Sequence, residues 1–329
     1  MDVMDGHADM DTKESHGLFQ FTGFSDDLFN VEPARQRHFI DRTYVPTDTI
    51  DGWFKQTPIE AAQHFNTKHG PTHTLYTIEY HYAQHNYSAA LDLCHQWLQS
   101  NASSKTLFNP RDVLEIAARC EMRTGRPEKA YELMQQIPES MHDPCVLFLR
   151  GRILCATQRF NRSLVCFLDY LNIRGEDYTA WTEISHVCSA LARCKVKQVD
   201  ETLCNNCVGN NEDISDETVS QVFLTAYLSI QKALYYLERS HRIFSRPENP
   251  FAMAHWRTEV ACIKQKLDEL VSMLKQMGQY VDENSYKNAT IDQDKLAEAG
   301  LDENVIHRLM TKLVETKSAE HDAVNAVSS

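Results

Sequence analysis

One pattern occurs three times in succession between Pro71 and Leu171, and it constrains the fold more than any other feature of the sequence. Each copy has a small residue followed four positions later by a bulky one, and the small residues are 40 and then 33 positions apart. A period in the thirties is typical of stacked helical hairpins. The small residue lets two antiparallel helices approach closely, and the bulky residue one turn later closes the pair. The pairs are Ala90 with Cys94, Ala130 with Met134, and Ser163 with Phe167.

The helix expected before each of these pairs also has a small site, which is Ala118 in copy two and Gly151 in copy three. A large and then a small residue in the first helix, with the small and bulky pair in the second, resembles the tetratricopeptide repeat. The resemblance implies an all-α fold, a tetratricopeptide-like solenoid of helical hairpins whose first helices line a concave groove that holds other chains. Copy one departs from the pattern at Ile78 and His81, and copy three departs at Arg150.

Four helix starts are marked by a capping side chain followed by proline, which favours the first helical position. Asn109-Pro110 and Asp143-Pro144 open first helices of the repeats and so support the repeat positions independently. Thr57-Pro58 opens an earlier helix, where Glu60 completes a capping box. Asn249-Pro250 opens a later one.

These signals divide the chain into six expected segments. The first helix of a fourth hairpin is expected from about Tyr178 to Arg193. A polar insertion separates it from its partner helix, which is expected to begin at about Asp216. A long helix that stops at Gly278 then caps the stack or, as the alternative, pairs two molecules. The segments are an acidic, disordered N-terminus (1–17), an extended aromatic and acidic segment (18–56), the repeats (57–194), an inserted loop (195–215), closing and capping helices (216–316) and a disordered tail (317–329).

Several short motifs considered together point to a closer resemblance. They are Glu32-Pro33 and Trp53-Phe54 before the repeats, Ala118-Arg119-Cys120 with Gly125-Arg126, the run Val146-Leu147-Phe148-Leu149, and the broken fourth pair. The chain is similar over most of its length to an animal family named for an open reading frame on human chromosome eight. That resemblance implies tetratricopeptide-like helices and adds no activity.

Composition excludes several classes of partner. The formal charge of −13 disfavours nucleic acid, because binding to the phosphate backbone needs a basic stripe. There is no run of eighteen apolar residues, and the N-terminus is acidic, so we expect neither a membrane partner nor a signal peptide. We therefore expect a cytoplasmic or nuclear protein with reduced thiols. Six cysteines occupy positions typical of a helical core, namely Cys94, Cys120, Cys155, Cys166, Cys188 and Cys262.

Metal-binding and catalytic patterns are weak. Cys204 and Cys207 form one pair in the inserted loop with Cys194 upstream, whereas a structural zinc takes four ligands, typically from two such pairs. Two loop thiols without a ligand are the simpler interpretation, and zinc is the alternative. His81 and His85 are one helical turn apart, but no third ligand is indicated. No nucleophile motif or phosphate loop is visible, so we expect no enzymatic activity, no cofactor and no small-molecule substrate.

Five residues projected onto the first helices are the candidate partner-binding residues. Arginine suits bidentate pairing with carboxylates, and aromatic rings accept apolar anchors, so a peptide with an acidic and aromatic motif is the expected ligand. An ordinary solvated charged face is the alternative. The residues are Arg119, Arg123, Arg152, Tyr82 and Phe148.

The sequence thus predicts a non-enzymatic adaptor that binds a peptide or partner subunit along the groove. The alternative is a structural subunit that contacts a larger assembly through its outer face and the helix near Trp256. Residues 18–30 contain four phenylalanines beside Asp26 and Asp27 and need a surface to cover them. We expect this segment to dock on its own repeats, with docking on another protein as the alternative.

Overall fold

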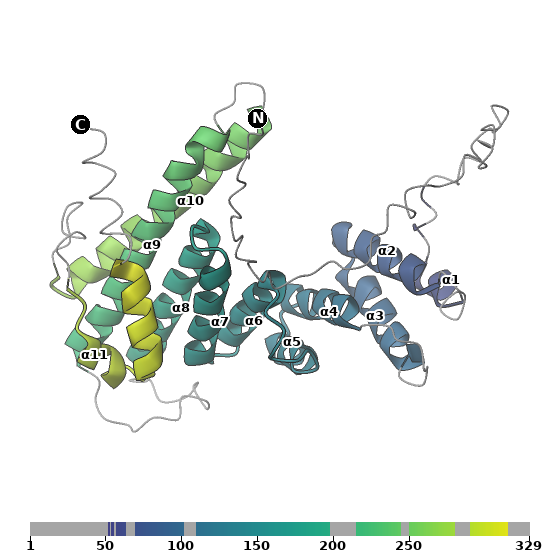
Figure 1. Cartoon of the computed structure of the whole chain (residues 1–329), viewed down its shortest axis with the longest axis horizontal. Helices are drawn as coiled ribbons and strands as arrows, with labels where there is room; N and C mark the ends of the chain where they lie inside the picture. Colours follow the sequence, from purple (N-terminus) through teal and green to yellow (C-terminus); the bar gives the residue numbers. More distant parts are fainter. Residues whose placement is uncertain are drawn as a thin grey trace, which may run out of the picture. The chain divides into compact units, whose positions relative to one another are not determined.

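The computed structural model describes residues 52, 54–55, 57–63, 70–101, 110–197, 215–244, 250–279 and 290–314. The chain divides into two units, residues 1–51 and 52–329, and all described residues lie in the second. Within the described ranges every regular element is a helix, and helices pack mainly against their neighbours in the sequence (Figure 1). The expected all-α class is therefore confirmed for this part of the chain. None of its helices combines the length and apolar character needed to cross a membrane.

A short helix, α1 (Pro58–Gln63), precedes three helical hairpins. Its expected capping box is present, since the Thr57 backbone N–H donates to Glu60 Oε2 at 2.9 Å and the Glu60 N–H donates to Thr57 Oγ1 at 3.4 Å. The hairpins are α2 (Gly70–Ala83) with α3 (Tyr87–Asn101), α4 (Arg111–Arg123) with α5 (Pro127–Met134), and α6 (Pro144–Ala156) with α7 (Phe160–Ile173).

The predicted helix starts agree closely with the observed ones. Asp143 caps α6, because its side chain accepts from the backbone N–H groups of Cys145 and Val146 at 2.8 and 3.4 Å. Helix α4 begins at Arg111, with Pro110 in the capping position, so Pro110 lies one residue outside the helix that it was expected to open. Asn109, its expected cap, lies outside the described residues.

The three hairpin turns share one geometry. His85, Gly125 and Gln158 have φ values of 59°, 75° and 59°, and each lies two residues before the second helix begins. In each turn the following N–H group donates to the carbonyl five residues earlier, which is the Schellman arrangement that closes the first helix. These bonds run from Asn86 to His81 at 2.9 Å, from Arg126 to Glu121 at 2.9 Å, and from Arg159 to Leu154 at 2.8 Å.

Close helix packing at the predicted small sites is clearest in the third hairpin. A Cβ atom added at Gly151 on α6 would lie 2.7 Å from Cζ of Phe167 on α7, so only glycine fits there without a shift. The Ser163 hydroxyl, also on α7, donates to the Gly151 carbonyl at 2.7 Å. The small and bulky pairs of the other two hairpins are buried as well.

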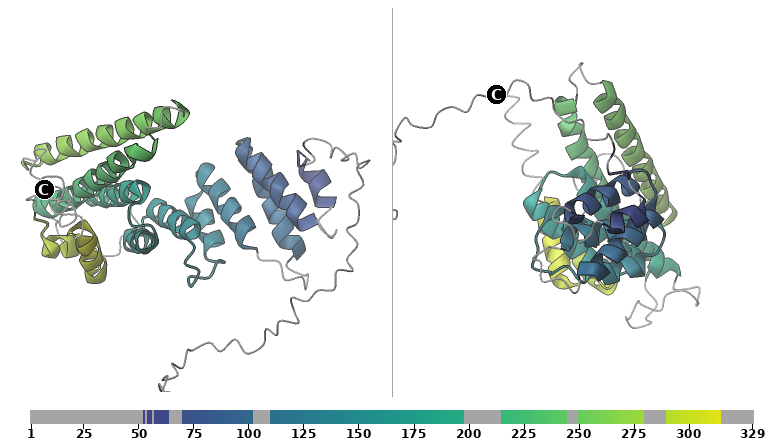
Figure 2. Two further views of the ribbon diagram at one scale, coloured as in Figure 1. Left: turned by 45° about the horizontal axis from the view of Figure 1, so that its top comes forward. Right: turned by 90° about the vertical axis from the view of Figure 1, so that its right-hand side faces the viewer.

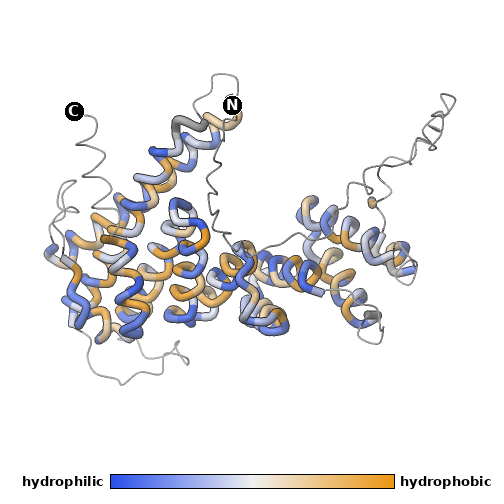
Figure 3. Tube along the Cα trace, in the orientation of Figure 1, coloured by the Kyte–Doolittle hydropathy of each residue, from blue (hydrophilic) through white to orange (hydrophobic). Residues whose placement is uncertain are grey.

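The remaining helices form a larger apolar core together with the third hairpin. Figure 3 shows the alternation of apolar and polar residues along them, which is typical of helices that bury one face. They are α8 (Tyr178–Lys197), α9 (Asp216–Phe244), α10 (Pro250–Gln276), α11 (Gln293–Glu298) and a final helical stretch at 303–314. Helix α8 runs three residues beyond the predicted repeat boundary at residue 194, whereas α9 begins at the predicted Asp216.

Helix α10 packs beside α9 (Figure 2). Its buried residues include Ile263, Leu270 and Leu274, and the Trp256 indole N–H donates to the Leu237 carbonyl at 3.0 Å. Trp256 thus faces the protein's own α9. The helix ends before Gly278, which has a φ of 77°, as expected for a C-terminal stop.

The cysteine prediction is correct at five positions and wrong at Cys262. Cys94, Cys120, Cys155, Cys166 and Cys188 are buried, but Cys262 is exposed on α10. Its neighbour Ile263 faces the core, and successive residues of a helix point about 100° apart. Cys262 is therefore turned away from the core that Ile263 enters.

Candidate functional site

The first-helix surface comprises the sides of α2, α4 and α6 that carry the five candidate residues. Arg119 and Arg123 lie one turn apart on α4, and Arg152 lies on α6. The Arg119 guanidinium holds a carboxylate of its own helix, with Nη2 at 2.7 Å and Nε at 3.2 Å from Glu115 Oε1. A spacing of four residues makes this pair predictable from the sequence.

A second ion pair engages Arg152, whose Nε is 3.4 Å from Glu183 Oε1 on α8. This partner could not be found from sequence spacing, because the pair depends on how α6 and α8 pack. Arg123 is exposed, and none of the ion pairs found among the described residues includes it. Of the three arginines that were expected to form a patch, Arg119 and Arg152 hold internal carboxylates, whereas Arg123 does not among the described residues.

The two aromatic candidates are half-buried and packed against other rings. Tyr82 meets Tyr87 edge-on, with ring centroids 5.5 Å apart. Phe148 lies against Phe167 and Tyr170, at centroid distances of 5.5 and 5.4 Å. Phe148 thus packs at the margin of the core, and only part of its ring is accessible to a partner side chain.

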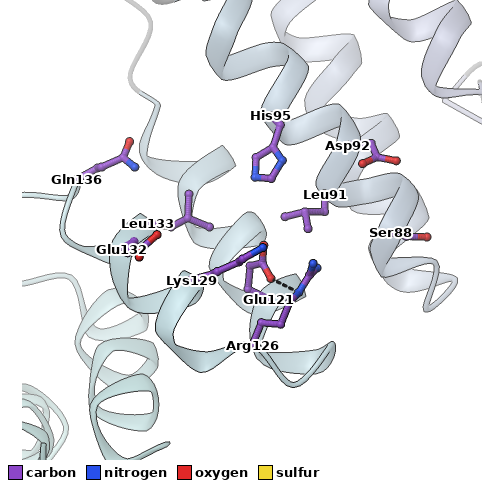
Figure 4. A pocket seen from close by; sticks show the side chains of 10 residues that line it. All are labelled: Ser88, Leu91, Asp92, His95, Glu121, Arg126, Lys129, Glu132, Leu133 and Gln136. Atoms are coloured by element: carbon purple, nitrogen blue, oxygen red, sulfur yellow. Dashed lines mark ion pairs between the residues drawn. The ribbon is translucent and has the colours of Figure 1, made fainter. Parts of the chain in front are cut away.

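A pocket of about 470 Å³ lies between the first two hairpins (Figure 4). We call it the inter-hairpin pocket. Sequence reasoning missed it, because it depends on the spacing between the second helices of successive hairpins. Its lining comes from α3, the end of α4, the turn between α4 and α5, α5 itself and one residue just beyond α5. The lining residues are Ser88, Leu91, Asp92, His95, Glu121, Arg126, Lys129, Glu132, Leu133 and Gln136.

A buried carboxylate lies at the inner side of this pocket. The Glu121 side chain is 2% exposed, and its Oε2 lies 2.6 Å from Nε of Arg126. The contact is a close ion pair without hydrogen-bond geometry, since Oε2 has no hydrogen-bond partner in the described structure. Arg126 also donates from Nε to Thr124 Oγ1 at 3.2 Å, so the arginine is held within the hairpin turn. A buried charge of this kind is costly unless it is paired.

The candidate metal ligands are not brought together in the described structure. Cys194 is half-buried near the end of α8, while Cys204 and Cys207 lie outside the described residues. A histidine, His85, bonds through Nδ1 to the Tyr87 hydroxyl at 2.8 Å. Among the described residues no group of three or more potential ligands is close enough to hold a metal ion. The absence of a loop zinc stays a prediction.

The buried thiols are poorly suited to nucleophilic chemistry. Burial raises the pKa of Cys120 and of Cys166 to about 11, and raises the pKa of Cys155 and of Cys188 to about 12. Burial also raises the pKa of Cys94. The thiolate is the nucleophilic form, so these five groups remain unreactive near neutral pH.

Comparison with protein-family models and with curated protein sequences gave no match to this chain.

Proposed function

We propose that the protein is a non-enzymatic adaptor, a tetratricopeptide-like solenoid that binds a peptide or partner subunit along the first-helix surface. One observation carries the proposal: three consecutive hairpins have a residue with a positive φ at the same position of the turn, namely His85, Gly125 and Gln158. Hairpins of one geometry, stacked side by side, present corresponding helices as a continuous binding surface.

An acidic and aromatic segment is the partner chemistry that suits this surface. Arg123 has no internal ion pair among the described residues and so offers a full positive charge. Arg152 is 47% exposed, and an ion pair at such a site contributes only about 0–1 kcal/mol. A partner carboxylate can therefore replace Glu183 at small cost, and the half-buried Phe148 lies one turn from Arg152 on the same helix.

Charge reversal at Arg123 is the cleanest test. Reversal of Arg119 is less clean, because the new carboxylate would lie one turn from Glu115. We expect Arg123→Glu to deplete the partners that co-purify with the full chain, as measured by quantitative mass spectrometry. Arg257→Glu on α10 is the matched control, since it makes the same charge change at another exposed arginine. Equal recovery of all partners with both variants would refute binding through the first-helix surface.

The alternative function is a structural subunit held through α10, and one observation favours it. Phe251, in the first turn of α10, is 82% exposed, which is unusual for a large apolar side chain. Loss of partners with Phe251→Ser and Arg257→Glu, but not with Arg123→Glu, would favour this second function over the first.

A further inference from the structure

The inter-hairpin pocket has charged side chains that no internal partner neutralises in the described structure. Glu121 and Arg126 pair with each other, so they contribute little net charge. Asp92, Lys129 and Glu132 also line the pocket, and none of these three takes part in an ion pair found among the described residues. The pocket therefore presents two carboxylates and one amine.

The two carboxylates flank an apolar strip. Asp92 extends from α3 on one side and Glu132 from α5 on the other, with Leu91 and Leu133 between them (Figure 4). Leu91 is buried and Leu133 is half-buried, so the strip belongs to the packed interface of the hairpins. A long basic side chain matches this arrangement, because its methylene stem covers apolar surface while its charged end meets a carboxylate.

We propose that the inter-hairpin pocket binds a lysine or arginine side chain of a partner protein. The formal charge of −13 on the whole chain favours the approach of basic partners. Lys129 extends into the same cavity and competes with the incoming cation for the carboxylates (Figure 4). This site lies on second helices, so it adds a contact beyond the proposed first-helix surface and does not depend on it.

Small capped amino acids are suitable probes for the full chain. We would label leucine methyl groups with ¹³C and follow Leu91 and Leu133 during titration with N-acetyl-arginine methylamide and N-acetyl-lysine methylamide. Both basic probes are expected to shift these methyl resonances in a saturable manner. N-acetyl-norleucine methylamide and N-acetyl-glutamate methylamide, which lack the cation, are expected to leave them in place.

Charge variants provide the decisive comparison. Asp92→Asn/Glu132→Gln removes both carboxylates and should raise the Kd of the arginine probe about fivefold, and Lys129→Gln should lower it about threefold. Asp268→Asn/Glu269→Gln on α10 makes the same charge change as the first variant at exposed positions and should leave the Kd unchanged.

Two outcomes would overturn the proposal. In one, the glutamate probe shifts the two leucines and Lys129→Gln abolishes that effect, which would identify a carboxylate site. In the other, none of the probes shifts either leucine up to its solubility limit. The test of Arg123→Glu is separate, so failure here leaves the proposed adaptor function intact.

Discussion

At the scale of single residues, the absence of a side chain at Gly151 determines how closely α6 and α7 approach. The Phe167 ring occupies the space where a Cβ atom would lie, and the Ser163 hydroxyl is bonded to the Gly151 carbonyl. The close approach follows from the small and bulky pattern that is visible in the sequence, whereas the hydrogen bond from Ser163 was not predicted. The partner ring itself was predictable, because Phe167 is the bulky member of the same copy.

Gly151→Ala should therefore destabilise the protein, although alanine normally favours a helix over glycine by about 0.5–1 kcal/mol. Overpacking in a rigid core costs about 1–3 kcal/mol, and this term should dominate. Gly175→Ala is the control, since its Cβ would come no closer than 3.6 Å to the Leu171 carbonyl oxygen. Urea unfolding followed by circular dichroism measures both. A stabilised Gly151→Ala variant would contradict the packing described for α6 and α7.

Buried thiols make stability fall at alkaline pH. The thiol of Cys188 ionises near its ordinary pKa of 9.0 in the unfolded chain, but burial raises the pKa to about 12 in the folded protein. Between these values the unfolded state binds fewer protons, so the free energy of unfolding decreases as pH rises. The loss approaches about 1.4 kcal/mol per pH unit for one fully buried group.

We therefore expect wild type to lose more stability between pH 8 and pH 10 than Cys188→Ala, by about 1 kcal/mol. The stability lost to the cavity that the substitution leaves is the same at both pH values, so it does not affect the change in stability between them. Cys262→Ala, at an exposed thiol, should follow wild type. Identical pH dependence in all three proteins would show that Cys188 is not buried as described.

At the scale of elements, the hairpin turns are more uniform than their sequences. A glycine, which adopts a positive φ without steric cost, occupies the left-handed position in only one of the three turns. His85 and Gln158 also have a positive φ although they carry side chains. The helices on either side impose the turn, and the residue accommodates it. Gly125 therefore carries a local turn signal in the sequence that His85 and Gln158 lack, and none of the three turn residues was predicted.

Reciprocal substitutions test this account of the turns. Gln158→Gly should raise the free energy of unfolding, because it relieves a left-handed side chain that costs about 1 kcal/mol. Gly125→Ala should lower it by a similar amount. Thermal or urea unfolding of the full chain measures both. Two changes of the same sign would indicate that the shared turn geometry is incorrect.

Sequence reasoning succeeded where local chemistry determines structure and failed where packing decides. The cap at Asp143, the stop at Gly278 and the start of α9 at Asp216 depend on nearby residues, and all were predicted. The pair between Arg152 and Glu183 depends on two helices that are not consecutive. The exposure of Cys262 depends on which side of α10 meets α9.

At the scale of the whole molecule, the two proposals concern different groups of residues. We propose that Arg123 on the first-helix surface receives an acidic partner, and that Asp92 and Glu132 of the inter-hairpin pocket receive a basic side chain. If both proposals hold, one partner that has both kinds of group can engage both sites. The expected docking of residues 18–30 lies outside the described residues and stays a prediction.

Site-specific photocrosslinking tests the central claim most directly. A photoreactive phenylalanine analogue placed at position 79, which is exposed on α2 one turn before Tyr82, samples the first-helix surface and leaves the five candidate residues in place. The same analogue at the exposed position of Lys266 samples α10. Mass spectrometry then identifies crosslinked proteins in cells that express the full chain. The adaptor account predicts a discrete crosslinked partner at position 79 and none at position 266. A partner captured only at position 266, or none at either site, would contradict it.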